Sequence, residues 1–228
     1  MIRNDLEIYS GRLHKYIGTA SELIIPDEVY SIDGYAFEYN NTLKKIILPQ
    51  SFDNIPQSAF CSCRALQSIV IPSTVRVIDA AAFYDCISLT DCVLPDGIIS
   101  IGRDAFSCCI SLETIKIPKK VISIGMSAFS ECSALKMIDL PYKLKRIEVG
   151  TFSSCERLEE VAFPEGLEEI ERIAFQNCKM LSYVEIPRSV KHIGPCAFNG
   201  CERLTIKVPE GCVCENNAFS WCRSVQRY

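Results

Sequence analysis

Apolar residues return along this chain with a period of 23. A Phe that follows Ala or Thr occurs eight times at that spacing, and a ninth copy comes after 21 residues. These positions are Phe37, Phe60, Phe83, Phe106, Phe129, Phe152, Phe175, Phe198 and Phe219. A fixed period of this length is the sequence signature of a solenoid built from stacked structural repeats.

A column of cysteines runs in register with the phenylalanines. Each stands three residues after its Phe, and only the first copy departs, with Asn40. The column is Cys63, Cys86, Cys109, Cys132, Cys155, Cys178, Cys201 and Cys222. A Leu six residues after the Phe and a Pro that closes each unit keep the same register. The columns therefore describe one uninterrupted array.

The polar and apolar positions within one unit predict its elements. Residues 105–112 place Ala, Phe, Cys and Leu on one face of a helical turn or two. Residues 115–117 alternate as a short strand, which Pro118 ends because it cannot donate to a ladder. A second short piece follows at 121–124, and we expect a glycine such as Gly125 to permit the turn before the next Phe.

One such unit cannot bury its apolar face alone, whereas stacked units can. The sequence therefore predicts a solenoid of about nine repeats over residues 21–222, with equivalent strands about 4.8 Å apart in parallel pairing.

The two ends differ from the array. Residues 1–20 predict an N-terminal β-hairpin cap, because strand-like runs flank Ser10-Gly11. Residues 223–228 are expected to form a C-terminal tail, and no polar capping repeat precedes them. Either Trp221 and Tyr228 fold over the last coil, or this edge is open to a partner. That partner could be a second copy of the chain, through self-association near Trp221.

The repeat "IGxxAFxxCxxLxxIxIPxxV" is clearest at 101–121 and 124–144, and it resembles the leucine-rich repeats of the BspA-like family. The resemblance implies a curved right-handed solenoid with a parallel β-sheet on the concave face and short helical turns or loops opposite. It implies protein binding, often at a bacterial or protozoan cell surface. It implies no catalytic residue.

Composition narrows the class of partner and the location. The chain has 228 residues and a formal net charge of −4, which argues against a nucleic-acid partner. No apolar run approaches the roughly 18 residues of a membrane helix, so membrane insertion is not expected. The start shows no secretory signal, which with free cysteines favours the cytoplasm. If the chain is a fragment, the resemblance favours the cell surface or secretion instead.

The fourteen cysteines allow three interpretations. Cys61–Cys63 and Cys212–Cys214 resemble metal pairs, and Cys108–Cys109 resembles a vicinal disulfide. The favoured interpretation is a column of buried free thiols that act as small hydrophobes. Cys92 stands where other copies have Ile or Val, which supports it.

No motif indicates catalysis. The chain has no GxSxG, HExxH, P-loop or GxGxxG sequence, and the repeat register turns His14 and His192 outward. We expect no enzyme, no cofactor and no metal.

Alternation along the first strand of each unit turns two columns outward on the concave sheet. Three consecutive apolar residues in one column indicate a partner site. The alternative interpretation is that β-branched residues stand there only because they are favoured on a sheet surface. The candidate binding residues are Ile47, Val70, Val93, Lys116, Met137, Asp139, Tyr183 and Glu185.

The sequence thus predicts a non-catalytic scaffold that binds a protein ligand on a preformed sheet, for surface adhesion or host-protein binding. The alternative is a structural spacer within a longer surface protein.

Overall fold

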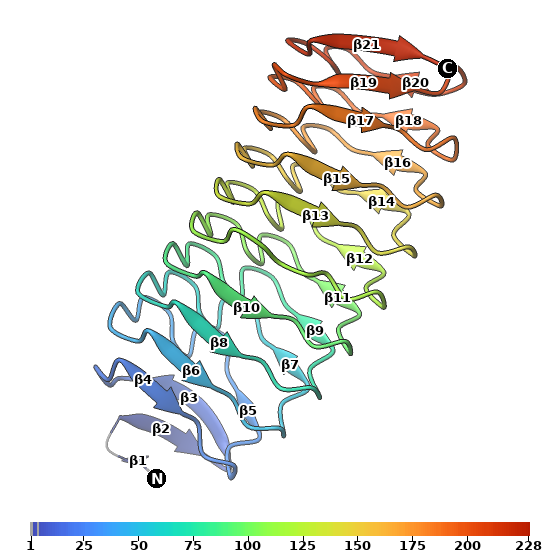
Figure 1. Ribbon diagram of the computed structural model, residues 1–228. Coiled ribbons are helices and arrows are strands. Elements are labelled where there is room, and N and C mark those ends of the chain that lie inside the picture. The colour runs from blue at the N-terminus through green and yellow to red at the C-terminus, as the bar shows by residue number, and fades with distance from the viewer. Residues whose placement is uncertain (1, 4) are drawn as a thin grey trace.

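Each repeat of the sequence forms one coil of a right-handed solenoid in the computed structural model of the chain (Figure 1). The structure describes residues 2–3 and 5–228, so Met1 and Asn4 of the expected cap lie outside the described residues. A coil consists of a strand, a loop after the Pro, a second short strand and a tight turn that carries the Phe, and only the coil of residues 114–116 lacks the first strand among the described residues. No helix occurs among the described residues, so tight turns take the place of the helical turns that were expected.

The first strands of the coils stack into a parallel ladder, here called the broad face. Its strands are β4 (Glu22–Ile24), β6 (Lys45–Ile47), β8 (Ser68–Val70), β10 (Asp91–Val93), β13 (Met137–Asp139), β15 (Glu160–Ala162), β17 (Tyr183–Glu185), β19 (Thr205–Val208) and β21 (Ser224–Arg227). They pair in three groups, β4 to β10, β13 with β15, and β17 to β21. Ser224–Arg227, which the sequence suggested as a tail, therefore extends the ladder by one more strand.

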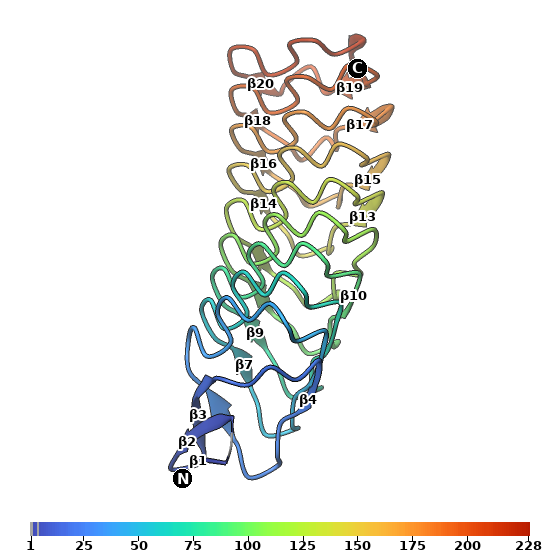
Figure 2. The same ribbon diagram turned by 90° about the vertical axis from the view of Figure 1, so that its left-hand side faces the viewer.

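The second strands stack into another parallel ladder, here called the narrow face. Its strands are β5 (Ser31–Ile32), β7 (Asn54–Ile55), β9 (Val77–Ile78), β11 (Ser100–Ile101), β12 (Ser123–Ile124), β14 (Arg146–Ile147), β16 (Glu169–Ile170), β18 (His192–Ile193) and β20 (Val213–Cys214). This ladder pairs in three groups: β5 pairs with β3 of the N-terminal hairpin, β7 to β12 form the second group, and β14 to β20 form the third. The breaks lie between β5 and β7 and between β12 and β14. The two faces lie on opposite sides of the stack (Figure 2).

The expected hairpin covers the N-terminal end of the narrow face. Strands β2 (Leu6–Tyr9) and β3 (Arg12–Tyr16) pair antiparallel around Ser10-Gly11, and both turn residues have positive φ. The two-residue strand β1 (Ile2–Arg3) pairs with β2, and β3 pairs in parallel with β5. Leu13 and Tyr16 of β3 are buried, so the hairpin closes this end of the core.

The phenylalanines form one continuous column through the core. Successive rings from Phe37 to Phe219 stack with centroids 4.9–6.0 Å apart. Each Phe N–H, from Phe37 to Phe198, donates to the Ala or Thr carbonyl of the next coil at 2.7–2.9 Å. The turns are therefore joined by side-chain stacking and by an unbroken row of backbone hydrogen bonds.

The cysteine column gives those turns a third link. Each thiol from Cys63 to Cys222 donates to the Phe carbonyl of the preceding coil, with Sγ to O distances of 2.9–3.3 Å. Cys63 to Cys201 are buried, which confirms the interpretation as buried thiols, and only Cys222 at the last coil is half-buried. Asn40 makes the corresponding bond in the first coil, from Nδ2 to the Gly18 carbonyl at 3.1 Å. A thiol suits the column because it packs as a small hydrophobe and still donates a weak hydrogen bond.

Glycine before the Phe serves close packing and not a turn, so that expectation was wrong. Gly102, Gly125 and Gly194 do not have positive φ. A Cβ on any of them would lie 2.5–2.6 Å from a backbone nitrogen of the preceding coil. The left-handed conformations fall instead on two residues that flank the Ala-Phe pair, such as Asp104 and Cys108.

The glycine contact yields a stability prediction. Gly125→Ala should lower the free energy of unfolding by more than about 2 kcal/mol, because the new methyl group overlaps the backbone at Arg103, which cannot move without shifting a coil. Gly211→Ala is the matched control, since nothing lies within 4 Å of its would-be Cβ, and a compatible Gly→Ala change stabilises by about 0.4–1 kcal/mol. Denaturant unfolding measures both. Equal effects in the two variants would contradict the close approach.

The thiol column yields a prediction on pH. Burial raises the pKa of Cys63 and Cys92 to about 12 and that of Cys109 well above its ordinary 9.0. The folded state thus retains protons that the unfolded state releases. The thiols therefore make their full contribution to the free energy of unfolding below about pH 9, and this contribution is lost as the pH rises toward about 12. Each thiol contributes a slope of about 1.4 kcal/mol per pH unit in that window.

Cys109→Ser isolates one member of the column, because a hydroxyl still donates but does not titrate there. Urea unfolding from about pH 8.5 to about pH 10.5 should show a slope smaller than the wild-type slope by about one proton. Identical slopes would mean that this thiol ionises equally in both states.

Candidate protein-binding face

Three of the predicted binding residues are direct neighbours on the broad face. Ile47 of β6 pairs with Val70 of β8, and Val70 pairs with Val93 of β10. Val70 is 48% exposed, Val93 is 72% exposed, and Ile47 is half-buried. Their strand neighbours at 46, 69 and 92 are buried, so alternation turns this column outward.

The structure adds a fourth residue that sequence reasoning missed. Ile24 of β4 pairs with Ile47 and is 70% exposed. The signal was present, since Ile24 stands one 23-residue period before Ile47. Parallel pairing spaces such neighbours about 4.8 Å apart. Ile24, Ile47, Val70 and Val93 are together called the apolar row.

The broad-face ladder is interrupted immediately after the apolar row. Residues 114–116 form no strand, and Thr114 makes a single bridge to Met137 of β13. A hollow of about 460 Å³ opens here between β10 and residues 114–116. Lys116 follows Val93 in the repeat register but is not paired with it.

Positive charge gathers beside this break. Lys116, Lys119 and Lys120 are exposed, and with Asp96 and Pro118 they line a further hollow of about 450 Å³. The ion pairs found in the described part of the chain include none of these three lysines. The apolar row therefore ends next to three ammonium groups that are available to a negatively charged partner.

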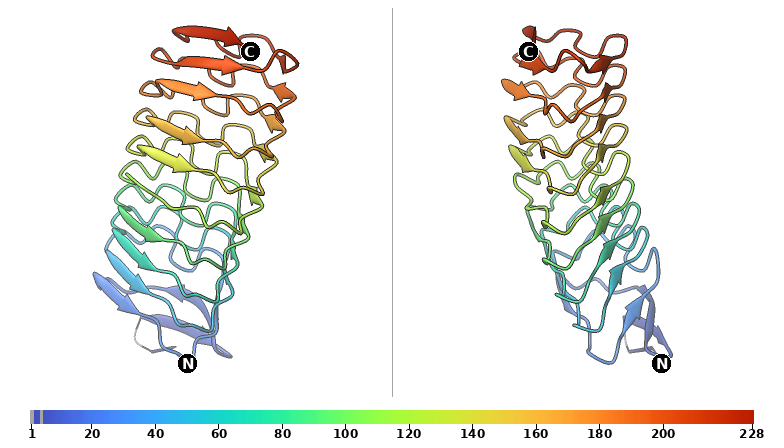
Figure 3. Two further views of the ribbon diagram at one scale, coloured as in Figure 1. Left: turned by 45° about the vertical axis from the view of Figure 1, so that its right-hand side comes forward. Right: turned by 90° about the vertical axis from the view of Figure 1, so that its right-hand side faces the viewer.

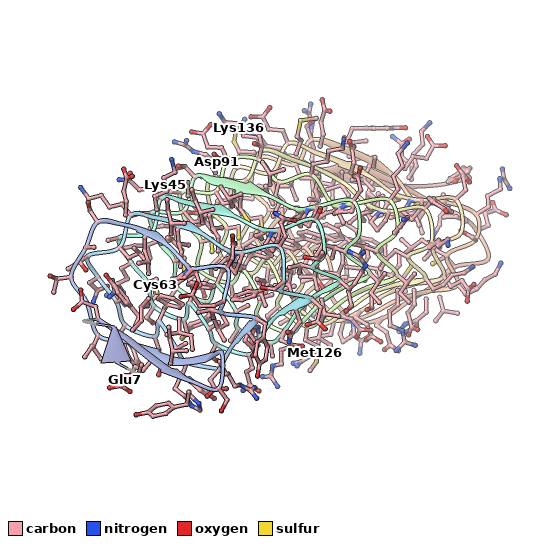
Figure 4. The ribbon with its side chains drawn as sticks, turned by 90° about the horizontal axis from the view of Figure 1, so that it is seen from below. Glu7, Lys45, Cys63, Asp91, Met126 and Lys136 are labelled. Carbon is pink, nitrogen blue, oxygen red and sulfur yellow. The ribbon has the colours of Figure 1, made fainter. Side chains whose placement is uncertain are left out.

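The remaining predicted residues form two separate groups. Met137 and Asp139 lie on β13, where they pair with Glu160 and Ala162 of β15. A second break separates β15 from β17, and a hollow of about 320 Å³ lies there. Figure 4 shows Lys45, Asp91 and Lys136 along one long side of the molecule, with Met126 on the opposite side.

Tyr183 and Glu185 of β17 belong to a polar cluster with Lys207 of β19. The Tyr183 hydroxyl donates to Oε2 of Glu185 at 2.7 Å, and this bond is the main reason that the pKa of Glu185 lies below its ordinary value. Nζ of Lys207 lies 3.6 Å from the same carboxylate. The structure thus brings the apolar row together, and it does not join these two groups to it.

The thiols of the cysteine pairs that resembled chemical sites contact nearby backbone or side-chain atoms, and those of Cys212 and Cys214 also interact with each other. Sγ of Cys108 lies 3.7 Å from Oε2 of Glu131, whereas Cys109 donates to the Phe83 carbonyl at 3.2 Å. Cys212 and Cys214 each donate to a backbone carbonyl within their own loop. All fourteen cysteines are free thiols.

Both histidines lie beside carboxylates, His14 exposed and His192 half-buried. Nδ1 of His14 is 2.6 Å from Asp33, and Nε2 of His192 is 3.2 Å from Glu215. Among residues 5–228, no group of three or more His, Cys, Asp or Glu side chains is placed to hold a metal ion. Within the same described residues, no helix could cross a lipid bilayer.

Solved structures share this arrangement of coils. A leucine-rich repeat protein of T. pallidum is 32% identical, with a TM-score of 0.70 over 75% of this chain and 82% of that chain. A leucine-rich repeat protein of Eubacterium ventriosum is 27% identical, with a TM-score of 0.69 over 91% of this chain and 60% of that chain. One from Bacteroides ovatus matches the fold with a TM-score of 0.71 over 100% of this chain and 74% of its own, at 24% identity.

No match was found among curated proteins. The sequence matches the family described as "BspA type Leucine rich repeat region (6 copies)" over residues 12–134 and 100–226, which together span nearly the whole solenoid. The period, the Ala-Phe turns and the cysteine column agree with that match. The chain therefore belongs to the BspA-type leucine-rich repeat family.

Proposed function

We propose that this chain is a non-catalytic protein-interaction scaffold whose partner binds the apolar row of the broad face. The observation that carries the proposal is the row itself. Four apolar side chains stand next to one another on paired strands, and Ile24, Val70 and Val93 are exposed. Contiguous exposed apolar residues commonly mark interaction sites.

The solenoid suits this role because its display surface is already formed. The strands that carry the row are fixed by parallel pairing and by the buried residues between them, such as Ile46 and Ile69. Binding then requires little ordering of the scaffold, so more of the contact energy remains as affinity.

The charges at the end of the row specify the partner further. Lys116, Lys119 and Lys120 favour a ligand that carries acidic residues beyond an apolar segment. Asp139, the next residue in the register, disfavours the continuation of such a ligand toward β15. The proposed partner is therefore a protein segment with an apolar stretch that ends in carboxylates.

Surface adhesion or host-protein binding is the biological setting that the family suggests for this scaffold. The fourteen free cysteines favour a reducing compartment instead, since half-buried Cys61 and Cys108 would be open to oxidation outside the cell. The alternative function is a structural spacer, which needs no partner site.

The proposal predicts that Val70→Asp weakens partner binding at least tenfold and changes the free energy of unfolding by less than about 1 kcal/mol, as expected of a surface site. Ala162→Asp is the matched control, because Ala162 is an exposed residue in the same column of the broad face, outside the row. A partner captured in stoichiometric amounts by wild-type protein would be titrated against both variants.

Equal binding by wild type and Val70→Asp would refute the apolar row as the site, whereas the failure of wild type to capture any stoichiometric partner would favour the spacer. Unfolding of Val70→Asp would mean that the row belongs to the core.

A further inference from the structure

The broad face has an open seam in its interior, between β10 and the coil of residues 114–116. These residues form no strand, and their coil carries no arrow between the green and the yellow strands of the broad face (Figure 3). The same two coils stay joined on the narrow face, where β11 pairs with β12. The opening is therefore confined to the broad face.

The seam leaves backbone groups of both coils without their usual partners in the ladder. The N–H of Leu48 donates to the next coil at 3.4 Å. Within the described residues, no such bond runs from Leu94, which holds the same place in its coil, to Lys116, and none runs from Glu113 back to Thr90. Backbone N–H and C=O groups close to a core are rarely left without a partner, so the two facing edges are suited to hydrogen-bond a ligand.

Two hollows join along this seam into one depression, here called the trough. The first, of about 460 Å³, is bounded by residues 90–96 on one side and 114–116 on the other. The second, of about 450 Å³, lies beyond the end of the strands, and both hollows have Asp96 and Lys116 in their walls. Liquid water occupies about 30 Å³ per molecule, so the first hollow has room for far more than one bridging water. Extended chain rises about 3.3 Å per residue, so residues 90–96 span about 20 Å, the length of an extended segment of about six residues.

The two ends of the trough differ in charge. Three exposed lysines line its downstream end, beyond the strands: Lys116, Lys119 and Lys120. Among the described residues that line this hollow, Asp96 is the one carboxylate, so the downstream end is positive. Asp91 lies at the upstream end, with Thr90 and Thr114. An acidic group is therefore favoured downstream and disfavoured upstream.

We infer that the acidic part of the partner lies in the trough as an extended strand, parallel to β10, with its carboxylates among the three lysines. The inference deepens the proposed function and rests on it for the existence of a partner. A strand presents N–H and C=O groups at the spacing of the ladder, so it matches both edges of the seam. The parallel direction follows from those edges, since every strand pair of the broad face is parallel.

A peptide fits the trough better than a simple anion does. The edges offer carbonyl oxygens, such as those of Thr90 and Lys116, which accept from peptide N–H groups but repel an anion. Val93 is more exposed than Val70, because no paired neighbour follows it in the ladder. An apolar residue ahead of the carboxylates would cover the open side of Val93.

A synthetic peptide tests the inference by fluorescence anisotropy with the full chain. The probe is fluorescein-labelled Thr-Val-Thr-Val-Glu-Asp-Glu with an amidated C-terminus. It should bind saturably, and each of three control peptides should bind at least tenfold more weakly. One control replaces the acidic residues by Gln and Asn, one reverses the order of the residues, and one is N-methylated at alternate residues. The last control separates strand pairing from attraction between charges.

Variants of the chain locate the site. Lys119→Gln combined with Lys120→Gln should weaken binding of the peptide at least tenfold. Lys179→Gln combined with Lys191→Gln is the matched control, because it removes the same charge from exposed residues on coils away from the trough, and it should change binding less than twofold. Hydrogen exchange supplies an independent measurement, in which the amides of Leu94 and Lys116 should gain protection on saturation with the peptide.

The results that contradict the inference are distinct from those that contradict the proposed function. No saturable binding of the probe, equal binding of the N-methylated or reversed peptide, or equal losses in the two double variants would each overturn the trough. A captured partner that loses affinity through Val70→Asp but keeps it in the Lys119 and Lys120 double variant would overturn the trough and leave the apolar row standing. Dependence of that partner on the two lysines, with no effect of Val70→Asp, would support the trough and refute the row.

Discussion

The row of tight turns that carries the phenylalanines is the constraint on which the other parts of the structure depend. In each coil the Phe N–H donates forward to the next coil, and the Cys thiol donates back to the Phe carbonyl of the coil before. The stacked rings fill the space between the turns. Because all three links repeat in register, a change in length within a coil must be absorbed elsewhere in that coil.

Both strand ladders are less continuous than this row. The broad face breaks after β10 and again after β15, and the narrow face breaks between β5 and β7 and between β12 and β14. The hydrogen bonds from each Phe N–H to the Ala or Thr carbonyl of the next coil run past all four breaks without interruption. The turns therefore hold the coils together, and the strand faces can open and vary. This division explains how the broad face can carry an apolar row, a cluster of lysines and a polar cluster without loss of the fold.

The repeat made most of the fold predictable from sequence, because a column that recurs every 23 residues must occupy equivalent places in the stack. The inward and outward alternation around Val70 follows from that rule alone. Other features arise from relations between coils that one repeat does not contain. Gly125 is required by its close contact with the backbone of the coil before it. Residues 114–116 have the same sequence pattern as the paired strands, yet they form no strand in the ladder. Strand β21 was not predicted, because deletions shorten the last coil and the paired residues of β19 and β21 are therefore only 19 positions apart in the sequence.

The first and the last described coils of the solenoid are built differently. At the N-terminus the chain reverses direction, and the antiparallel pair of β2 and β3 places Leu13 and Tyr16 over the first coil. In the last described coil the repeat shortens but keeps its direction, so Phe219, Cys222 and Val225 still occupy core columns. The regularity that fixes the interior coils therefore also fixes where the aromatic and thiol side chains of the last described coil lie.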